Sequence, residues 1–402
     1  MANVSSSNGL EKRPKLRFPN FDEPWQSTLL SSVFAKNTKK NTDGQITNVI
    51  CNSAKQGLIP QREYFDKDIA NSDNTSGYYI IEENDFVYNP RKSSDAPYGP
   101  ISSYKYPDAG IVSPLYLCFR AKGAINPSFY EWYFRSSAWH RYVYMSGDSG
   151  ARHDRVSIKD DVFFAMPISI PSAREQEHIA SFLDMIDQRI DKQRTLVDNL
   201  KKYKRGVVSA ILSHRIVFSD ADGKPYPEWT SCTLQDAVVF LDGQRKPLES
   251  ADRARRQGKY PYYGASGIID YIDDYIFDEP LLLLGEDGAN IINRSTPLCF
   301  IATGKYWVNN HAHVMRPQNG HNIKFLCELL ESLDYTRYNT GTAQPKLNQE
   351  KCRGIELNLP IYEEQCRIAD FLSSLDQKAE REQANLDCLL LFKRGLMQQL
   401  FI

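Results

Sequence analysis

The chain has 402 residues, of which 41% are hydrophobic and 25% are charged, and its formal net charge is −1 at pH 7. This length predicts two or three domains with substantial cores, and the near-neutral charge excludes a uniformly basic nucleic-acid coat but not local basic patches. The eight cysteines form no CxxC pair, which argues against a zinc ribbon or a disulfide framework, and no signal-peptide core or apolar run of about 18 residues is present, so we expect a cytoplasmic protein that does not span a membrane.

The predicted elements alternate between β-rich bodies and long helices. Residues 1–16 form a polar tail, and residues 17–170 form a body with short apolar runs between turn residues, such as GYYIIEENDFVY. A long helix is predicted for residues 171–215, a second β-rich body for 216–359, with the run PLLLLGEDG, and a second long helix for 360–402. We therefore predict an α+β fold in which two long helices separate two β-rich globular domains.

The two helical segments are copies of one another. Pro171 to Leu212 aligns without a gap with Pro360 to Phe401, and the shared strings include Glu-Gln near the start and Lys-Arg-Gly near the end. The two bodies also begin and end alike, but no residue-by-residue match is found between those ends. An internal repeat of this kind predicts two similar bodies related by an approximate two-fold rotation, and hence a bipartite target or partner.

Each helical copy carries a coiled-coil seam, because its apolar residues step alternately by four and three positions. About forty residues at about 1.5 Å rise give a rod of about 60 Å. Polar residues interrupt both seams at equivalent places, with Gln193 matching Glu382 and Lys204 matching Lys393, and such residues fix register and partner. The seam residues are Ile179, Leu183, Ile186, Ile190, Val197 and Leu200 in the first copy, and Ile368, Leu372, Leu375, Leu386, Leu389 and Leu396 in the second.

The chain resembles the specificity subunit of type I restriction–modification systems. The resemblance covers nearly the whole chain and is carried by LRFPNFDEPW, PSAREQEHIASFLDMIDQRI, YYGASGIIDYIDDYIFDEP, LLGEDGAN, WVNNHAHV and TGTAQPKLNQ. It implies two target-recognition domains, with the helices paired antiparallel as a spacer, that face the halves of an asymmetric bipartite site in double-stranded DNA. It also implies that two modification subunits, which use S-adenosylmethionine, and restriction subunits, which use ATP and magnesium, assemble on a non-catalytic chain.

The residues themselves predict no reaction centre. An adenine methyltransferase requires a glycine loop and an Asn/Asp-Pro-Pro-aromatic motif, whereas the nearest string, Asn89-Pro90-Arg91-Lys92, lacks the second proline and the aromatic residue. A P-loop is also absent. We therefore expect no catalytic residue and no cofactor bound directly by this chain.

Two strings have competing interpretations. His311 and His313 alternate and can face one side of a strand, but no third ligand motif lies nearby, so a structural hydrogen-bonding role is favoured over metal binding or DNA contact. Glu286 and Asp287 resemble a nuclease carboxylate pair, yet no lysine stands at a suitable spacing. A turn, or acceptors for a cytosine amino group, is the favoured interpretation of that pair.

In the first body, two polar loops are the candidates for reading DNA, because phosphate requires cations and base edges require amides, guanidiniums and hydroxyls. In YNPRKSSDAPYGP, Asn89 is suited to adenine, Arg91 or Lys92 to guanine, and Ser93 and Tyr98 to phosphate or sugar, while SGDSGARHDR offers Arg152, His153 and Arg155. The alternative is that both loops are solvated turns whose arginines pair with Asp148 or Asp154.

In the second body, GQRKPLESADRARRQGKYPYYGASG is the densest cationic stretch of the chain, and we predict that it follows phosphates. The alternative is an exposed, salt-bridged helix face, and its tyrosines are as typical of a core as of a groove. The predicted DNA contacts here are Arg245, Lys246, Arg255, Arg256, Tyr262, Tyr263, Ser266, Asn309, Asn310, His311, Thr342, Gln344 and Lys346.

Three functions remain open on the sequence. The leading hypothesis is a non-catalytic DNA-specificity subunit. The others are a self-contained DNA-modifying enzyme of unusual sequence and a scaffold whose two bodies bind protein or glycan. A basic cluster, Lys201, Lys202, Lys204 and Arg205, near the end of the first helix fits either stabilisation of a helix C-terminus or docking of a partner subunit.

Overall fold

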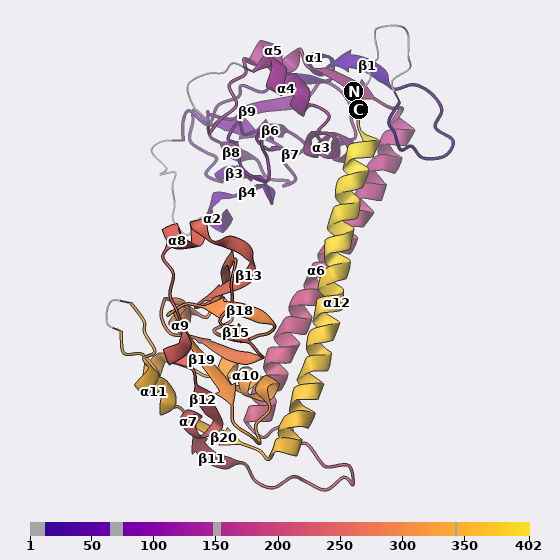
Figure 1. Ribbon diagram of the computed structural model, residues 1–402. Helices are drawn as coiled ribbons and strands as arrows, with labels where there is room; N and C mark the ends of the chain where they lie inside the picture. Colours follow the sequence, from indigo (N-terminus) through magenta and orange to yellow (C-terminus); the bar gives the residue numbers. More distant parts are fainter. Residues whose placement is uncertain (1–12, 65–74, 148–153, 342–343) are drawn as a thin grey trace. The chain divides into compact units, whose positions relative to one another are not determined.

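The computed structural model describes residues 13–64, 75–147, 154–341 and 344–402. Two long helices, α6 (Ala173–Leu212) and α12 (Tyr362–Leu400), each contribute to both of the units into which the chain divides (Figure 1). Unit 1 comprises the residues up to Gln193 together with those from Asn385, and unit 2 comprises Arg194–Ala384. The predicted α+β class, with two β-rich bodies and two long helices, is confirmed. Among the described residues, no helix is both long enough and apolar enough to cross a membrane.

Unit 1 contains a four-stranded antiparallel sheet and three strand pairs at its margins. The sheet has the order β2-β9-β6-β7, and the pairs are β1 with β10, β3 with β4 and β5 with β8. The elements are β1 (Gln26–Leu29), α1 (Leu30–Val33), β2 (Phe34–Lys36), β3 (Ile50–Ser53), β4 (Gly57–Pro60), α2 (Gln61–Tyr64), β5 (Tyr79–Ile81), β6 (Phe86–Tyr88), β7 (Ile101–Ser103), β8 (Gly110–Val112), β9 (Leu117–Ala121), α3 (Pro127–Arg135), α4 (His140–Ser146), α5 (Asp160–Phe164) and β10 (Pro167–Ile170).

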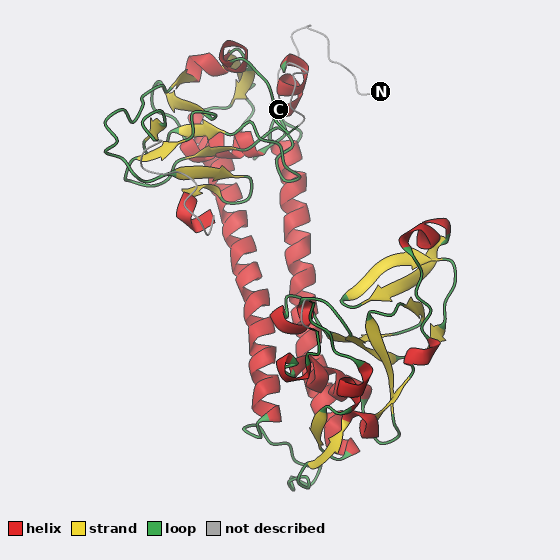
Figure 2. Cartoon of the chain, turned by 90° about the vertical axis from the view of Figure 1, so that its left-hand side faces the viewer, coloured by secondary structure: helices red, strands yellow, loops and turns green. Residues whose placement is uncertain are grey.

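Unit 2 contains two four-stranded sheets, of order β12-β19-β16-β17 and β14-β13-β18-β15, and the pair β11 with β20. The long β13–β14 hairpin lies at the end of this unit away from β11 and β20 (Figures 1 and 2). The elements are β11 (Thr230–Thr233), α7 (Leu234–Ala237), β12 (Val238–Phe240), the 3₁₀ helix η2 (Asp242–Gln244), α8 (Ser250–Arg255), β13 (Gln257–Gly264), β14 (Gly267–Ile272), β15 (Phe277–Asp278), β16 (Leu281–Gly285), α9 (Asn290–Asn293), β17 (Cys299–Ala302), β18 (Lys305–Val308), β19 (Ala312–Pro317), α10 (Ile323–Ser332), the 3₁₀ helix η3 (Thr336–Tyr338), α11 (Gln349–Arg353) and β20 (Glu356–Leu359).

The two units share one frame even where their sequences do not match. The sheet β2-β9-β6-β7 of unit 1 and the sheet β12-β19-β16-β17 of unit 2 have the same strand order and the same antiparallel pairing. Each frame opens with a strand and a four-residue helix and ends with a strand that leads into a long helix. A sheet is held by backbone hydrogen bonds and needs only apolar side chains on its buried face, so this frame tolerates sequence divergence.

Helices α3 and α10 are equivalent down to individual hydrogen bonds. Each begins after an asparagine whose side chain accepts a backbone N–H of the first turn. Beyond α3, the Trp139 indole N–H donates to the Phe134 carbonyl over 2.8 Å, and beyond α10 the Tyr335 hydroxyl donates to the Leu330 carbonyl over 2.8 Å. The internal repeat therefore extends through the bodies, where sequence comparison found no match.

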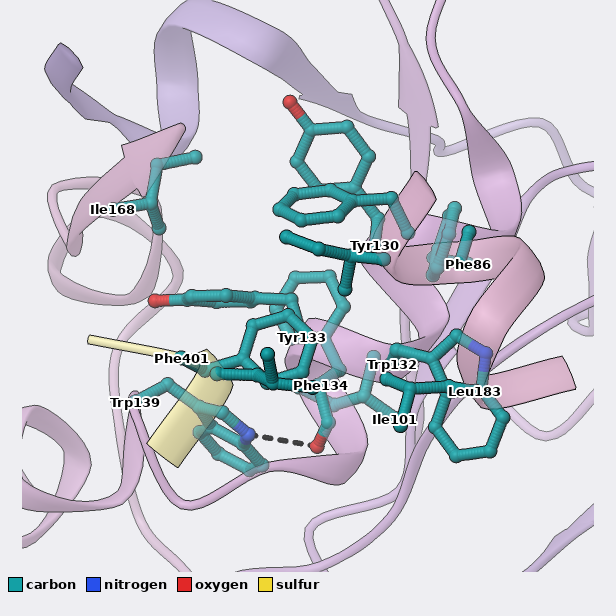
Figure 3. Packing of buried hydrophobic residues seen from close by; sticks show 14 of the residues in the cluster. Phe86, Ile101, Tyr130, Trp132, Tyr133, Phe134, Trp139, Ile168, Leu183 and Phe401 are labelled. Atoms are coloured by element: carbon teal, nitrogen blue, oxygen red, sulfur yellow. Dashed lines mark hydrogen bonds between the residues drawn. The ribbon is translucent and has the colours of Figure 1, made fainter. Parts of the chain in front are cut away.

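The aromatic core of unit 1 is closed by the end of α12. Ile179 and Leu183 of α6 lie in one buried cluster with Leu396, Leu400 and Phe401. The Phe401 ring lies 5.8 Å from that of Phe129 and 6.2 Å from that of Tyr133, beside Phe134 and Trp139 (Figure 3). Buried aromatic rings contribute large apolar areas, so this helix end is part of the core and not an external brace.

Unit 2 has the reciprocal arrangement, because its core is closed by the end of α6. Val207, Val208 and Ile211 lie in one buried cluster with Phe325 and Leu326 of α10. The start of α12 joins them through Ile368, Ala369 and Leu372. In each unit, the first part of one long helix packs against the last part of the other. The helices are therefore antiparallel, as predicted.

Lys204 and Lys393, the polar residues that interrupt the two seams, each form an ion pair between the two long helices. In unit 2 the Lys204 ammonium lies 2.8 Å from the Asp376 carboxylate and 2.6 Å from that of Glu328 on α10. In unit 1 Lys393 pairs with Asp187 and lies 4.6 Å from the centre of the Trp132 ring on α3. Asp187 and Asp376 are equivalent in the repeat, so two equivalent lysine–aspartate pairs fix the register between the two helices.

The helix starts differ in one buried carboxylate. Glu175 near the start of α6 is held by Arg17 through two hydrogen bonds of 2.8 Å. Its equivalent, Glu364 near the start of α12, is 4% exposed, and its Oε2 has no hydrogen-bond partner. Burial raises the pKa of the Glu364 carboxyl, against the smaller opposing effect of a hydrogen bond with Trp229.

We predict opposite effects for the same substitution at these equivalent sites. The raised pKa of Glu364 means that the protein loses stability as pH rises through that folded-state pKa. Glu364→Gln should therefore raise the free energy of unfolding at pH 7 by about 1 kcal/mol, the scale of one unpaired buried polar atom, and have little effect below about pH 4. Glu175→Gln should lower it by about 2 kcal/mol because it breaks a charged hydrogen-bond pair. Denaturant unfolding at both pH values measures this, and a stability loss from both substitutions at pH 7 would contradict it.

Candidate nucleic-acid interface

The two loops predicted to read DNA in the first body come together in unit 1. Arg91, in the loop after β6, forms an isolated antiparallel bridge with Arg155, in the segment before α5. The Val156 N–H donates to the Pro90 carbonyl, and the Lys92 N–H donates to the Asp154 carbonyl, each over 2.8 Å. Two segments far apart in the sequence thus form one backbone-paired unit.

A groove of about 430 Å³ lies beside this paired unit, and we call it the unit 1 groove. Its lining includes the candidates Asn89, Arg91, Lys92, Ser93 and Arg155 together with Asn52, Ser53, Leu115 and Tyr116. Asn52 is buried; its amide donates to the Val87 carbonyl over 2.8 Å, and its oxygen accepts from the Ser102 hydroxyl over 2.8 Å. The groove thus has a fixed polar floor and a rim with three cations.

Several unit 1 candidates have roles that the sequence did not indicate. The Asn89 amide donates to the Asn52 carbonyl, and its oxygen accepts the Arg91 N–H, so both of its polar groups hold the loop. The reading of adenine by Asn89 stays a prediction. Tyr98 is half-buried, with its ring centre 4.7 Å from that of His140. Arg155 lies 3.8 Å from Asp154, as the solvated-turn alternative anticipated. Arg152, His153 and Asp148 lie outside the described residues.

Unit 2 builds the same paired unit at the same place in its frame. Asp287, in the loop after β16, forms an isolated antiparallel bridge with Lys346, in the segment before α11. The Leu347 N–H donates to the Glu286 carbonyl over 2.7 Å. Strand β16 occupies the position of β6 and helix α11 that of α5, so the candidate segments of the two units are structurally equivalent.

Polar, accessible side chains from four segments gather around this pair in unit 2. His311 and Lys346 have side chains 48% and 50% exposed, and the His311 ring nitrogen lies 2.7 Å from the Asp287 carboxylate. The turn at Ser266 reaches the same place because Gly285 permits close approach, where a Cβ would lie 2.7 Å from the Ala265 carbonyl oxygen. Asn310 and Gln344 are exposed nearby in the chain, and Thr342 lies outside the described residues.

Four candidates of unit 2 have structural contacts within the unit. Tyr262 is 0% exposed, and its hydroxyl accepts the Leu248 N–H, so it belongs to the core and cannot touch DNA. Asn309 is 4% exposed, and its oxygen accepts the His311 N–H. Tyr263 is half-buried against Phe300 and Tyr306. The fourth, Arg245, binds Glu286 and the Ala312 carbonyl over 2.8 and 2.7 Å.

The dense cationic stretch of unit 2 is largely neutralised by acids that follow it on β14 and after it. Arg253 lies 3.1 Å from Asp270, and Arg256 lies 2.8 Å from Asp273. Arg255, on α8, is 80% exposed and 3.9 Å from Asp252, while Lys246 is exposed. The salt-bridged alternative therefore describes this stretch better than continuous phosphate tracking does, because the sequence showed the cations but not the strand that pairs with them.

His313 is structural, as favoured from the sequence. Fully buried on β19, its ring lies between the Asp242 carboxylate, 2.7 Å from Nδ1, and the Leu347 carbonyl, 2.8 Å from Nε2. Burial is the largest influence on the pKa of Asp242 and would raise it, but the hydrogen bonds from His313 and Val314, together with the charges of His313 and Arg245, lower the pKa below its ordinary value. Among the described residues, no group of three or more His, Cys, Asp or Glu side chains is arranged to hold a metal ion.

Comparisons with known proteins bear on this arrangement. Residues 226–388 match the family model described as the type I restriction modification DNA specificity domain. A putative type I restriction enzyme specificity subunit of Haemophilus influenzae is 32% identical over 149 residues, which is 37% of this chain and 37% of that protein. The EcoprrI specificity subunit of Escherichia coli is 30% identical over 145 residues, 36% of this chain and 35% of that protein. The matched regions thus span little more than a third of these curated relatives.

Solved structures match over almost the entire chain. The S subunit of a type I restriction–modification system from M. genitalium has a TM-score of 0.55 at 15% identity and covers 97% of this chain and 99% of its own. The HsdS subunit from Thermoanaerobacter tengcongensis has a TM-score of 0.51 at 16% identity, with 98% and 99% coverage. A chain from a study of complex assembly in the type I R-M system has a TM-score of 0.61 at 15% identity, with 95% and 98% coverage. The resemblance to type I specificity subunits is confirmed, and the fold is theirs.

The reassignment of Arg245 gives a prediction about stability. Arg245→Gln removes the cation nearest to the partly buried Glu286, at 2.8 Å, and leaves the more distant Lys346 at 3.5 Å, so it should lower the free energy of unfolding by about 3 kcal/mol. Arg255→Gln removes the same charge from an exposed site and should change it by less than about 0.5 kcal/mol. Urea unfolding followed by circular dichroism compares the two variants, and equal effects would contradict the structural role.

Proposed function

We propose that this chain, whose residues 226–388 belong to the type I restriction modification DNA specificity family, is the DNA sequence-recognition subunit of a type I restriction–modification complex. Residues 17–170 and 216–359 act as two target-recognition domains, and the helical segments 171–215 and 360–402 act as the spacer between them. Each domain reads one half of an asymmetric bipartite site in double-stranded DNA. The chain works in the cytoplasm, where that DNA lies.

One observation carries this proposal: both units build the same paired segments at the same strand end and mount different side chains on them. One backbone frame that carries different surface side chains in each unit is suited to the recognition of two different DNA sequences. In unit 1 the rim cations Arg91, Lys92 and Arg155 suit phosphate oxygens and the acceptor edge of guanine. In unit 2 the half-buried Asp287 pairs with the exposed His311, and its carboxylate adds an acceptor suited to a base amino group.

The chain acts without chemistry of its own in this proposal. The sequence has neither a methyltransferase base-binding motif nor a P-loop. S-adenosylmethionine therefore belongs to two modification subunits, and ATP and magnesium belong to restriction subunits. This assignment separates the proposal from a self-contained DNA-modifying enzyme, which would methylate or cleave DNA as the purified chain alone.

Methylome sequencing of cells that carry the modification subunits, with and without this chain, tests the proposal. We expect a two-part methylated motif that appears only with the chain. The double variant Arg91→Ala with Arg155→Ala should lower either methylation or the discrimination between bases in one part of the motif by about tenfold. The other part should be unchanged. The reason is that one base contact contributes about 1–3 kcal/mol of discrimination. Lys122→Ala, an exposed site outside the groove, is the matched control. A motif that does not depend on the chain would overturn the proposal.

The helices offer two equivalent places for two copies of one partner. Tyr203 on α6 is 59% exposed and Phe392 on α12 is 54% exposed, and these aromatic residues occupy the same position in the repeat. Leu391, beside Phe392, is 67% exposed. Exposed aromatic side chains are typical of protein interfaces, and a repeated one suits a repeated partner, which we assign to the modification subunits.

We predict that Tyr203→Ser and Phe392→Ser each remove one modification subunit from the complex without loss of stability, because both side chains lie mostly in solvent. Native mass spectrometry of the reconstituted complex should change from two modification subunits per chain to one for each single variant and to none for the double variant. Tyr144→Ser, on α4 and 70% exposed, is the control. Retention of both subunits by the double variant would rule out this surface.

A further inference from the structure

A buried charge network in unit 2 joins four segments behind the candidate DNA-reading groups. We define it as Asp242 of η2, Arg245, Glu286 after β16 and His313 of β19. Arg245 donates to Glu286 over 2.8 Å, and the His313 ring lies 2.7 Å from Asp242 and 3.8 Å from Glu286. The segment before α11 joins through the Leu347 carbonyl and through Gln349, whose amide lies 2.9 Å from Asp242.

Hydrogen bonds hold both ring nitrogens of His313 in this network. The Leu347 carbonyl only accepts, so Nε2 must carry a proton. Asp242 also acts as an acceptor, because its carboxylate receives the Val314 N–H and the Gln349 amide. His313 Nδ1 lies 2.7 Å from this same carboxyl group, so hydrogen bonds hold both ring nitrogens of the buried side chain. Arg245 and Lys346 are the neighbouring cations, and Glu286 is the second anion.

Such a network sets positions more than it adds stability. A buried ion pair repays its desolvation only with near-ideal geometry, so it holds its partners in one arrangement. Here the partners are the backbone of Leu347, next to Lys346, and the loop of Glu286, next to Asp287. Lys346 and Asp287 are the two bridge residues of the candidate interface. Displacement of His313 would therefore move both of them.

Unit 1 has no counterpart at the equivalent position. In the shared frame, Leu117 of β9 pairs with Tyr88 as His313 of β19 pairs with Leu284. Leu117 is apolar and half-buried, and the unit 1 groove is floored by the neutral amide of Asn52. The two units thus hold equivalent segments by different contacts, and the buried charge network is specific to unit 2.

We infer that His313, fixed by Asp242, is a positioning residue that determines specificity for the half-site read by unit 2. This inference rests on the proposed function. His313 does not touch DNA, because it is fully buried. It fixes the positions of Asp287, His311 and Lys346 relative to the bases. If these contact residues are displaced, discrimination between bases falls more than affinity for DNA does.

The test uses the complex of the full chain with its modification subunits and the two-part motif found by methylome sequencing. Methylation rates are measured on duplexes with single base-pair substitutions in either part. His313→Leu introduces the residue that unit 1 has at this position and removes both hydrogen bonds. We expect it to lower discrimination in one part of the motif by about tenfold and to leave the other part unchanged. Leu117→Ala, at the equivalent site, should not affect the part that His313→Leu affects.

Thermal melts establish that each variant is folded. If His313→Leu does not fold, His313→Gln, which keeps one amide donor for the Leu347 carbonyl, provides the same comparison. Discrimination that is unchanged in both parts, or lowered equally in both, would overturn the inference while the motif itself still supports the proposed function. A failure to find any chain-dependent motif would instead remove the proposed function.

Discussion

The structure depends on an exchange of helix ends between the two copies of the repeat. Unit 1 is completed by the last turns of α12, with Phe401 among its aromatic rings, and unit 2 is completed by the last turns of α6, with Ile211 in its core. Neither β-rich body has a full core without a helix that begins in the other unit. Because each long helix belongs to both cores, the pairing of the helices is enforced by burial at both ends and not only by the seam. The equivalent pairs Lys204–Asp376 and Lys393–Asp187 add register to that burial.

The same exchange leaves the candidate interface surfaces of the two units free to differ. The frame of each unit is held by backbone pairing between short strands and by side chains that face the long helices. The segments after β6 and β16 are held by backbone hydrogen bonds to the segments before α5 and α11 and by the side chains of Asn89 and Glu286, so the exposed side chains beside them carry little of the fold. Unit 1 uses them to place cations around a groove, whereas unit 2 balances its charges. Two surfaces with different side chains can therefore be built on one architecture.

Buried polar groups mark where the two copies have diverged most. Glu175 has Arg17 as its partner, while Glu364 keeps one oxygen unpaired. His313 is hydrogen-bonded to the buried Asp242 where unit 1 has Leu117. An apolar core tolerates substitutions of similar volume, but a buried charge requires its specific partner. Each such buried group therefore depends on a partner that only its own unit provides. These sites are where one copy of the repeat should least tolerate the residues of the other.

The sequence by itself determined the repeat, the two long helices and the α+β class, because periodicity and self-similarity are local properties of the chain. It also placed Arg91, Lys92, Arg155 and Lys346 in exposed candidate segments. Only the tertiary structure decided that Tyr262 and Asn309 are buried, that acids on and after β14 neutralise Arg253 and Arg256, and that Arg245 holds Glu286. It also extended the repeat through α3 and α10, where equivalent hydrogen bonds join different side chains. The physical reason is that burial and ion pairing depend on residues far apart in the chain, and a single sequence does not show which distant segments meet.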